Sequence, residues 1–207
     1  MTICGVLRSG AVLAVALLAL CAGTVKTAHA STGCPDYSLE HPFLPWLDPL
    51  SYTQAPNGGL EDGSTSWSLT GGAAVVGGNE SFSVGGAGDS HALALPAGSS
   101  ATTGTTCVTM LDAAMRLFVV NTGSLLSTLK VEVLYTDASG RPRAQPIGLL
   151  LGTRTWQPTL PTLLLANLAY PPLITDGHVD VAFRFTPQGS LGAWRIDDVY
   201  VDPLKGS

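Results

Sequence analysis

The chain has 207 residues, of which 15 are acidic and 10 are Lys or Arg, giving a formal net charge of −5. Nucleic acids and anionic membranes bind clustered Lys and Arg, so this balance argues against both as partners. The length suits one domain with a sizeable core.

The first thirty residues are predicted to be a cleaved signal peptide, which would make the protein secreted. Arg8 precedes the apolar run AVLAVALLALCAGTV, and Ala28–Ala30 has the small-x-small pattern of a cleavage site. The run is shorter than the roughly 20 residues of a membrane span, and no second run of that length follows it. Cleavage removes Arg8 and Lys26, which lowers the basic count from 10 to 8 against 15 acidic residues. The alternative is a lipid anchor at Cys21, but Leu20 stands where a lipoprotein signal carries a small residue.

Two of the four cysteines, Cys34 and Cys107, lie outside the predicted signal peptide. An even pair of cysteines in an oxidising compartment predicts a disulfide. It would close a loop of 73 residues and stabilise the fold by up to about 4 kcal/mol in the loop-entropy view.

The segment 31–56 is predicted to be a Pro-rich extended arm, because its prolines oppose regular helix and central strand. Besides Cys34, we expect three apolar side chains to hold this arm on the body of the protein, namely Phe43, Trp46 and Leu47.

From Asn57 the chain consists of short alternating runs separated by Gly, Ser, Asn and Asp, which is typical of an all-β domain. The clearest runs, LKVEVLYTD and HVDVAFRFT, each have one apolar and one polar face. They predict an antiparallel β-sandwich over 57–203, followed by a short tail over 204–207. The residues expected to form one core between the sheets are Trp67, Leu93, Val131, Val133, Val181, Phe183, Val199 and Val201.

Three stretches in order carry a resemblance to a known family: NGGLEDG followed by Trp67, then GAGDSHALALPAG, and finally WRIDDVYVDP. Together they resemble the jelly-roll carbohydrate-binding modules of the galactose-binding-like superfold. The resemblance covers roughly Asn57 to Pro203 and leaves out the arm, and Leu60 stands where those modules usually carry Phe. It implies a jelly-roll sandwich, without catalytic activity, that binds carbohydrate.

In that family a structural calcium is often held between the first and last strands, and the resemblance implicates Glu61 and Asp197 as its ligands. Strict alternation places Asp197 on the inward face with Val199 and Val201, and a carboxylate there needs a partner. A site of hard oxygen atoms suits calcium. The alternatives are solvated acids or an ion pair with Arg195 or Arg184, and the sequence leaves open whether Asp197 or Asp198 faces a cation.

Sugar binding requires aromatic rings that are exposed beside polar groups. The two aromatic residues outside the arm that are best placed for exposure are Trp156, in GTRTWQPT, and Tyr170, before two prolines. The strand faces predicted to be solvated carry charged residues and no aromatic ring, which argues against sugar binding on them.

The sequence GDSHA, Gly88–Ala92, is similar to the opening motif of an esterase family and would make Ser90 a nucleophile. A nucleophile elbow needs a helix after the serine, but an alternating strand follows here, with Ser90 and His91 expected on opposite faces. The sequence therefore favours a secreted, non-catalytic β-sandwich that binds carbohydrate and holds a structural calcium. A structural or adhesive protein of the cell envelope or matrix is the alternative.

Overall fold

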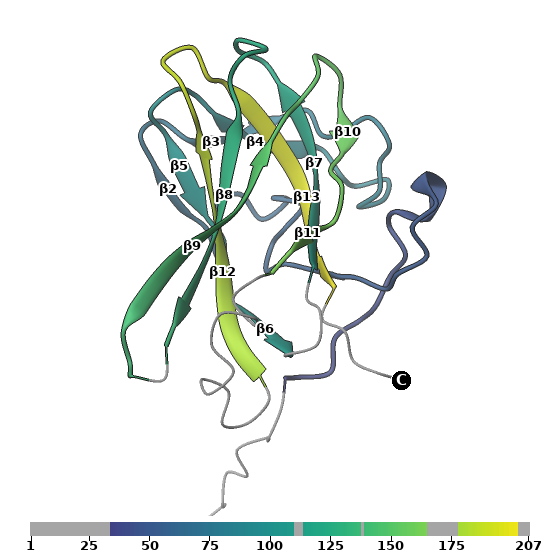
Figure 1. Cartoon of the computed structure of the whole chain (residues 1–207). Helices are drawn as coiled ribbons and strands as arrows, with labels where there is room; N and C mark the ends of the chain where they lie inside the picture. The colour runs from purple at the N-terminus through teal and green to yellow at the C-terminus, as the bar shows by residue number, and fades with distance from the viewer. Residues whose placement is uncertain (1–33, 110–113, 138, 165–177, 203–207) are drawn as a thin grey trace, which may run out of the picture. The chain divides into compact units, whose positions relative to one another are not determined.

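The computed structural model describes residues 34–109, 114–137, 139–164 and 178–202. These residues form two antiparallel sheets packed face to face, which confirms the predicted all-β sandwich (Figure 1). The predicted signal peptide and the tail lie outside the described residues. No helix in the described part of the chain has the length and apolar character needed to cross a membrane.

One sheet, named here the β13 sheet, has the strand order β10-β7-β13-β4-β3. In addition, β1 pairs with β13, and β11 pairs with β7. Its strands are β1 (Thr53–Gln54), β3 (Ala74–Gly77), β4 (His91–Leu95), β7 (Ala114–Asn121), β10 (Gln157–Pro158), β11 (Thr162–Leu163) and β13 (Trp194–Asp202). The other, the β12 sheet, has the order β2-β5-β12-β8-β9, with β6 also paired to β12. Its strands are β2 (Ser68–Thr70), β5 (Ser100–Thr102), β6 (Thr106–Thr109), β8 (Leu129–Thr136), β9 (Pro142–Leu150) and β12 (His178–Pro187).

The main core lies between the two sheets and contains every residue predicted for it. Period-2 alternation in β8 and β12 puts Val131, Val133, Val181 and Phe183 inward, and each of these four side chains is fully buried. Because β8 and β12 are adjacent and antiparallel, with Phe183 opposite Val133, their apolar faces coincide. A hairpin follows β8: β9 pairs with β8, and Gly140 has the positive φ of a turn residue.

The arm packs on the outer face of the β13 sheet, where it contains the short 3-10 helix η1 (Leu44–Trp46) and strand β1 (Figure 1). Phe43 and Tyr52 of the arm form a second apolar cluster with Phe118 of β7 and Tyr200 of β13. Trp46 packs against the same cluster. The prediction for Leu47 was wrong, because its left-handed backbone at the end of η1 turns the side chain outward and leaves it 93% exposed.

Two polar links complete the attachment of the arm. Asp48 forms an ion pair with the buried Arg116 of β7 at 2.5 Å, and the Arg116 guanidinium lies 4.0 Å from the centre of the Phe43 ring. At the other end, Cys34 is joined to Cys107 of β6, with 5.4 Å between their Cα atoms, as predicted.

Candidate functional site

The candidate site forms at an irregularity in β13. Asp197 lies opposite Phe118 of β7, but Tyr200 lies opposite Arg116, so two residues of β13 face only one residue of β7. This is a β-bulge, and Asp198 at its centre has a left-handed backbone with φ of 49°. The bulge lies where the neighbour of β13 changes from β4, at Trp194–Ile196, to β1, at Tyr200–Val201.

Because of the bulge, the prediction that side chains alternate strictly between the two faces along WRIDDVYVD is wrong. Ile196 and Val199, three residues apart, both belong to the main core, whereas strict alternation would place them on opposite faces. Asp197 therefore does not share a face with Val199 through simple alternation. Both aspartates are fully buried.

The two buried aspartates have different partners. One oxygen of Asp197 accepts the backbone N–H of Glu80 at 3.0 Å, and the other accepts the N–H of Asp198 at 2.8 Å. Asp198 Oδ1 accepts a hydrogen bond from Gln54 Nε2 at 2.9 Å, while Asp198 Oδ2 is buried and has no hydrogen-bond partner among the described residues. Both oxygens of Asp197 thus accept backbone N–H groups, whereas Oδ2 of Asp198 has no partner among the described residues.

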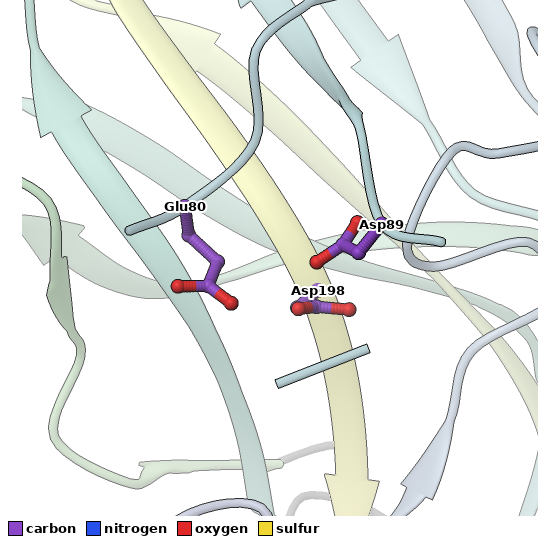
Figure 2. Close-up of side chains that lie close together, drawn as sticks. All are labelled: Glu80, Asp89 and Asp198. Carbon is purple, nitrogen blue, oxygen red and sulfur yellow. The ribbon is translucent and has the colours of Figure 1, made fainter. Parts of the chain in front are cut away.

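Asp198 lies in a group of three carboxylates, the acidic triad Glu80, Asp89 and Asp198, that could hold a metal ion. One ligand atom from each of the three residues lies within 4.8 Å of the other two. Figure 2 shows the three carboxyl groups close together, with Asp198 on β13 and the other two on chain segments beside that strand. Glu80 and Asp89 lie near the two ends of the loop 79–90, which with Gly78 connects β3 to β4.

The electrostatics of this group favour a cation. Burial, followed by the charges of Asp89 and Glu80, raises the pKa of Asp198 to about 7. Burial and the charge of Asp198 raise the pKa of Asp197 to about 9. Burial also raises the pKa of Asp89, and the charges of Glu61 and Glu80 act in the same direction. Among the described residues, no ion pair links the triad or Asp197 to Lys or Arg.

The immediate surroundings of the triad fit a bound ion. Asp89 Oδ1, like Asp198 Oδ2, is buried without a hydrogen-bond partner among the described residues, and such orphaned oxygen atoms call for a ligand. Glycines bring the backbone close: a Cβ on Gly85 would lie 3.2 Å from Asp89 Oδ2, and one on Gly59 would lie 3.2 Å from Asp198 Oδ1. Carboxylate oxygens are ligands that Ca²⁺ prefers.

Glu61, the other predicted ligand, lies beside the triad but is not one of its members. Its carboxylate accepts the backbone N–H groups of Ser90 and His91, both at 2.8 Å. Although burial acts in the opposite direction, these hydrogen bonds and those of the two side chains lower the pKa of Glu61 to about 2. Glu61 also contacts the carboxyl group of Asp89, which places it at the margin of the acidic group.

The structure corrects the expectation that Ser90 and His91 point apart. Ser90 Oγ lies 3.0 Å from His91 Nδ1, and both atoms contact Glu61 Oε2. In a proton relay, one imidazole nitrogen contacts the serine and the other contacts the acid. Here the same nitrogen, Nδ1, faces both, so this group lacks the geometry of an esterase triad.

The alternative partners proposed for the aspartates are engaged elsewhere or unpaired. Arg184 contacts Glu132, with 2.8 Å between Nε and Oε2, and Arg195 forms no ion pair among the described residues. Of the two predicted sugar-binding residues, Trp156 is partly buried and packs against the second apolar cluster. Tyr170 lies outside the described residues.

An open groove of about 570 Å³ crosses the outer face of the β12 sheet. Its lining includes the small or apolar side chains of Leu134, Ala144 and Ala182 and the charged side chains of Arg143, Asp180 and Arg184. Tyr135 also borders the groove but is only 7% exposed, because its ring faces the core.

Sequence reasoning missed Glu80 and Asp89 as site residues because they lie in a Gly-rich loop without periodicity. Glu80 meets Asp197 across 117 positions of the chain, and no local pattern specifies such a contact. The signal that was available is the pair of acids at the two ends of NESFSVGGAGD, which face a strand containing two more acids.

Comparison with known proteins identifies the fold. One similar solved structure is the N-terminal CBM22-1-CBM22-2 tandem domain of Xyn10C from Paenibacillus barcinonensis, with a TM-score of 0.52, 11% identity and coverage of 84% of this chain and 49% of that chain. Another contains the CBM22-1 and GH10 modules of endo-1,4-β-D-xylanase 10B from Clostridium thermocellum in complex with xylohexaose; its TM-score is 0.51, with 12% identity over 69% of this chain and 27% of that chain. No protein-family model and no curated protein matches the sequence. At these identities the likeness is one of fold, and the described residues have the jelly-roll fold of carbohydrate-binding modules.

Proposed function

We propose that this protein is a secreted, non-catalytic carbohydrate-binding domain with a structural calcium ion. The observation that carries the binding proposal is the groove on the outer face of the β12 sheet. Each sheet of a sandwich has one outer face. On the β13 sheet, the arm covers this outer face with Phe43 and Tyr52. Among the described residues, the β12 sheet is therefore the one with an open outer face.

Although the sequence argued against sugar binding on this face for want of an exposed aromatic ring, the groove has side chains that can bind hydroxyl groups. Asp180 accepts hydrogen bonds and Arg184 donates them, while Ala182 and Leu134 offer apolar surface to a sugar ring. The solved structures of similar fold include one with a bound xylohexaose, and β-1,4-linked xylan is the first ligand to test. Trp156 and Tyr170 remain candidates for contacts outside the groove.

The calcium proposal rests on Glu80, Asp89 and Asp198, with Glu61 and Asp197 in the surrounding acidic group. A bound cation would supply the positive charge that these buried carboxylates lack. Its role in this proposal is structural, because the three carboxylates come from one strand and both ends of a loop. Binding only to the folded state would raise the melting temperature by mass action.

A glycan array that includes xylan oligosaccharides, probed in calcium chloride and in EDTA, tests the binding proposal. We expect retention of at least one neutral β-linked glycan, and weaker retention of the Asp180→Asn and Arg184→Gln variants. Arg154→Gln is the control, because Arg154 is exposed and outside the groove. If both groove variants bind glycan as well as the wild-type protein does, the binding site lies away from the β12 sheet. Absence of any glycan binding would favour the structural or adhesive role.

A further inference from the structure

The acidic triad has direct contacts with the N-terminal arm as well as with the sandwich. Gln54, in strand β1 at the end of the arm, donates a hydrogen bond to Asp198 Oδ1 at 2.9 Å. The same segment pairs with β13 just beyond the bulge, with Gln54 opposite Tyr200. The position of Asp198 is therefore tied to the position of the arm.

A second connection runs through Glu80 and the loop 79–90. The Glu80 carboxylate accepts the backbone N–H of Phe82 and, at 2.5 Å, that of Val84. It thus contributes to the triad and also fixes the backbone of its own loop. Displacement of this carboxylate would displace the loop residues that it holds.

The loop residues held by Glu80 contact the arm directly. Phe82 meets Trp46 of η1 edge to face, with 4.9 Å between ring centroids, and also lies 5.6 Å from Phe118. Val84 packs against the cluster of Phe43, Tyr52, Phe118 and Tyr200. A continuous chain of contacts thus leads from the carboxylates to the surface on which the arm lies.

The remaining attachment of the arm is made elsewhere, by side chains outside the triad. Phe43 stacks on Phe118 with 5.5 Å between ring centroids, and Asp48 pairs with Arg116. Asp48 is not a member of the acidic triad. A change at Asp48 therefore tests the arm without altering a proposed cation ligand.

We propose that cation binding at Glu80, Asp89 and Asp198 is coupled to docking of the arm, so that each stabilises the other. The inference rests on the calcium site of the proposed function. Without a cation, repulsion among the three carboxylates opposes the positions of Gln54 and Glu80 that the docked arm requires. With a cation, the carboxylates are drawn together, and the loop 79–90 and β1 are held against β13. Calcium thereby controls how firmly the arm covers the aromatic outer face of the β13 sheet.

Coupling of this kind is reciprocal, and reciprocity supplies the test. The factor by which calcium strengthens docking equals the factor by which docking strengthens calcium binding, so a change that undocks the arm weakens calcium affinity by up to that factor. Isothermal titration of the full chain with calcium chloride, with the disulfide intact, measures that affinity. We expect Asp48→Asn to weaken calcium binding by roughly five-fold or more, the lower end of common coupling strengths.

Two further variants separate coupling from a simple change of charge. Asp62→Asn removes an acid next to Glu61 that is exposed and outside the arm, and it should change calcium affinity less than two-fold, since exposed charges are well screened. Phe82→Ala alters no charge and removes a partly exposed ring between loop and arm, so it should fold and still weaken calcium binding. If Asp48→Asn fails to fold, Phe82→Ala alone tests whether arm docking is coupled to calcium binding.

Hydrogen exchange provides an independent readout. Backbone amides of the arm should exchange more slowly in calcium chloride than in EDTA, and Phe82→Ala should reduce the difference. The coupling would be contradicted if Asp48→Asn and Phe82→Ala both bound calcium with wild-type affinity, or if exchange of the arm amides did not respond to calcium. Either result would leave the proposal of a calcium site unaffected. Failure of the wild-type protein to bind calcium would overturn the site and the coupling together.

Discussion

Adjacent aspartates in β13 have separate roles, and the difference arises from their backbone conformations. Asp197 precedes the bulge and uses both oxygens to accept backbone N–H groups. Asp198 has a left-handed backbone, which Asp tolerates better than most residues, and its Oδ2 has no partner among the described residues. The chain therefore places a buried carboxylate that has one unpartnered oxygen among the described residues inside the acidic triad.

Replacement of Asp198 by Asn should abolish the stabilisation by calcium. In the wild-type protein, free calcium at about 100 times its Kd should add about 2.7 kcal/mol, or roughly 5–10 °C in melting temperature for a domain of this size. Asp198→Asn should lose most of that rise, and Asp62→Asn should keep it. In EDTA, Asp198→Asn should be at least as stable as wild type, because the amide removes a repelling charge. Differential scanning calorimetry of the three proteins in calcium and in EDTA measures these melting temperatures, and an unchanged calcium response in Asp198→Asn would contradict the site.

At the scale of elements, sequence reasoning succeeded where a single rule controls the strand. β8 and β12 obey period-2 alternation throughout, so Val131, Val133 and Phe183 could be placed in the core from the sequence. The same rule failed in β13, because a bulge adds one residue and reverses the phase after Asp197. Alternation cannot reveal a bulge that arises from the change of neighbouring strand. The arm was recognised from its prolines, but its contacts with β7 depend on long-range packing that those prolines do not specify.

Docking of the arm on β7 should weaken in acid. Although burial raises the pKa of Asp48, hydrogen bonds from Tyr52, Leu50 and Arg116 outweigh it and lower the pKa below its usual value. A carboxylate with a lowered pKa stabilises the folded state at pH values above its unfolded pKa, near 4, and this stabilisation is lost as the pH falls through the folded pKa. We expect the protection of the arm amides, after correction for the intrinsic pH dependence of exchange, to decrease as the pH falls below this value.

The matched variant for this pH dependence is Asp48→Asn, which keeps the shape of the side chain but cannot titrate. It should lower the free energy of arm docking by about 2 kcal/mol, a typical value for a hydrogen bond to a charged group. Its arm should exchange faster at neutral pH, with little further change in acid. An arm that loosens equally in acid in both proteins would assign the effect to another carboxylate.

For the whole molecule, the arm is attached to both sheets. Its first described residue, Cys34, is joined to Cys107 of β6 in the β12 sheet, and its strand β1 pairs with β13 in the other sheet. Of the described residues of the arm, Ala55 alone belongs to the sandwich core. The disulfide therefore holds the arm on the sandwich and does not take part in the packing between the two sheets.

Removal of the disulfide should lower global stability while leaving the sandwich folded. The bond spans 73 positions, so the Cys34→Ser, Cys107→Ser double variant should lose up to about 4 kcal/mol of unfolding free energy, since its unfolded chain is less constrained. Tyr37, which exchanges two hydrogen bonds with the backbone of Cys107, should lose its fixed position first. Hydrogen exchange should accordingly increase most near the N-terminal end of the arm, and amides of β8 and β12 should remain protected. Urea unfolding gives the free energy, and a variant that loses protection equally in the arm and in β8 would show that the arm and the sandwich fold as one cooperative unit.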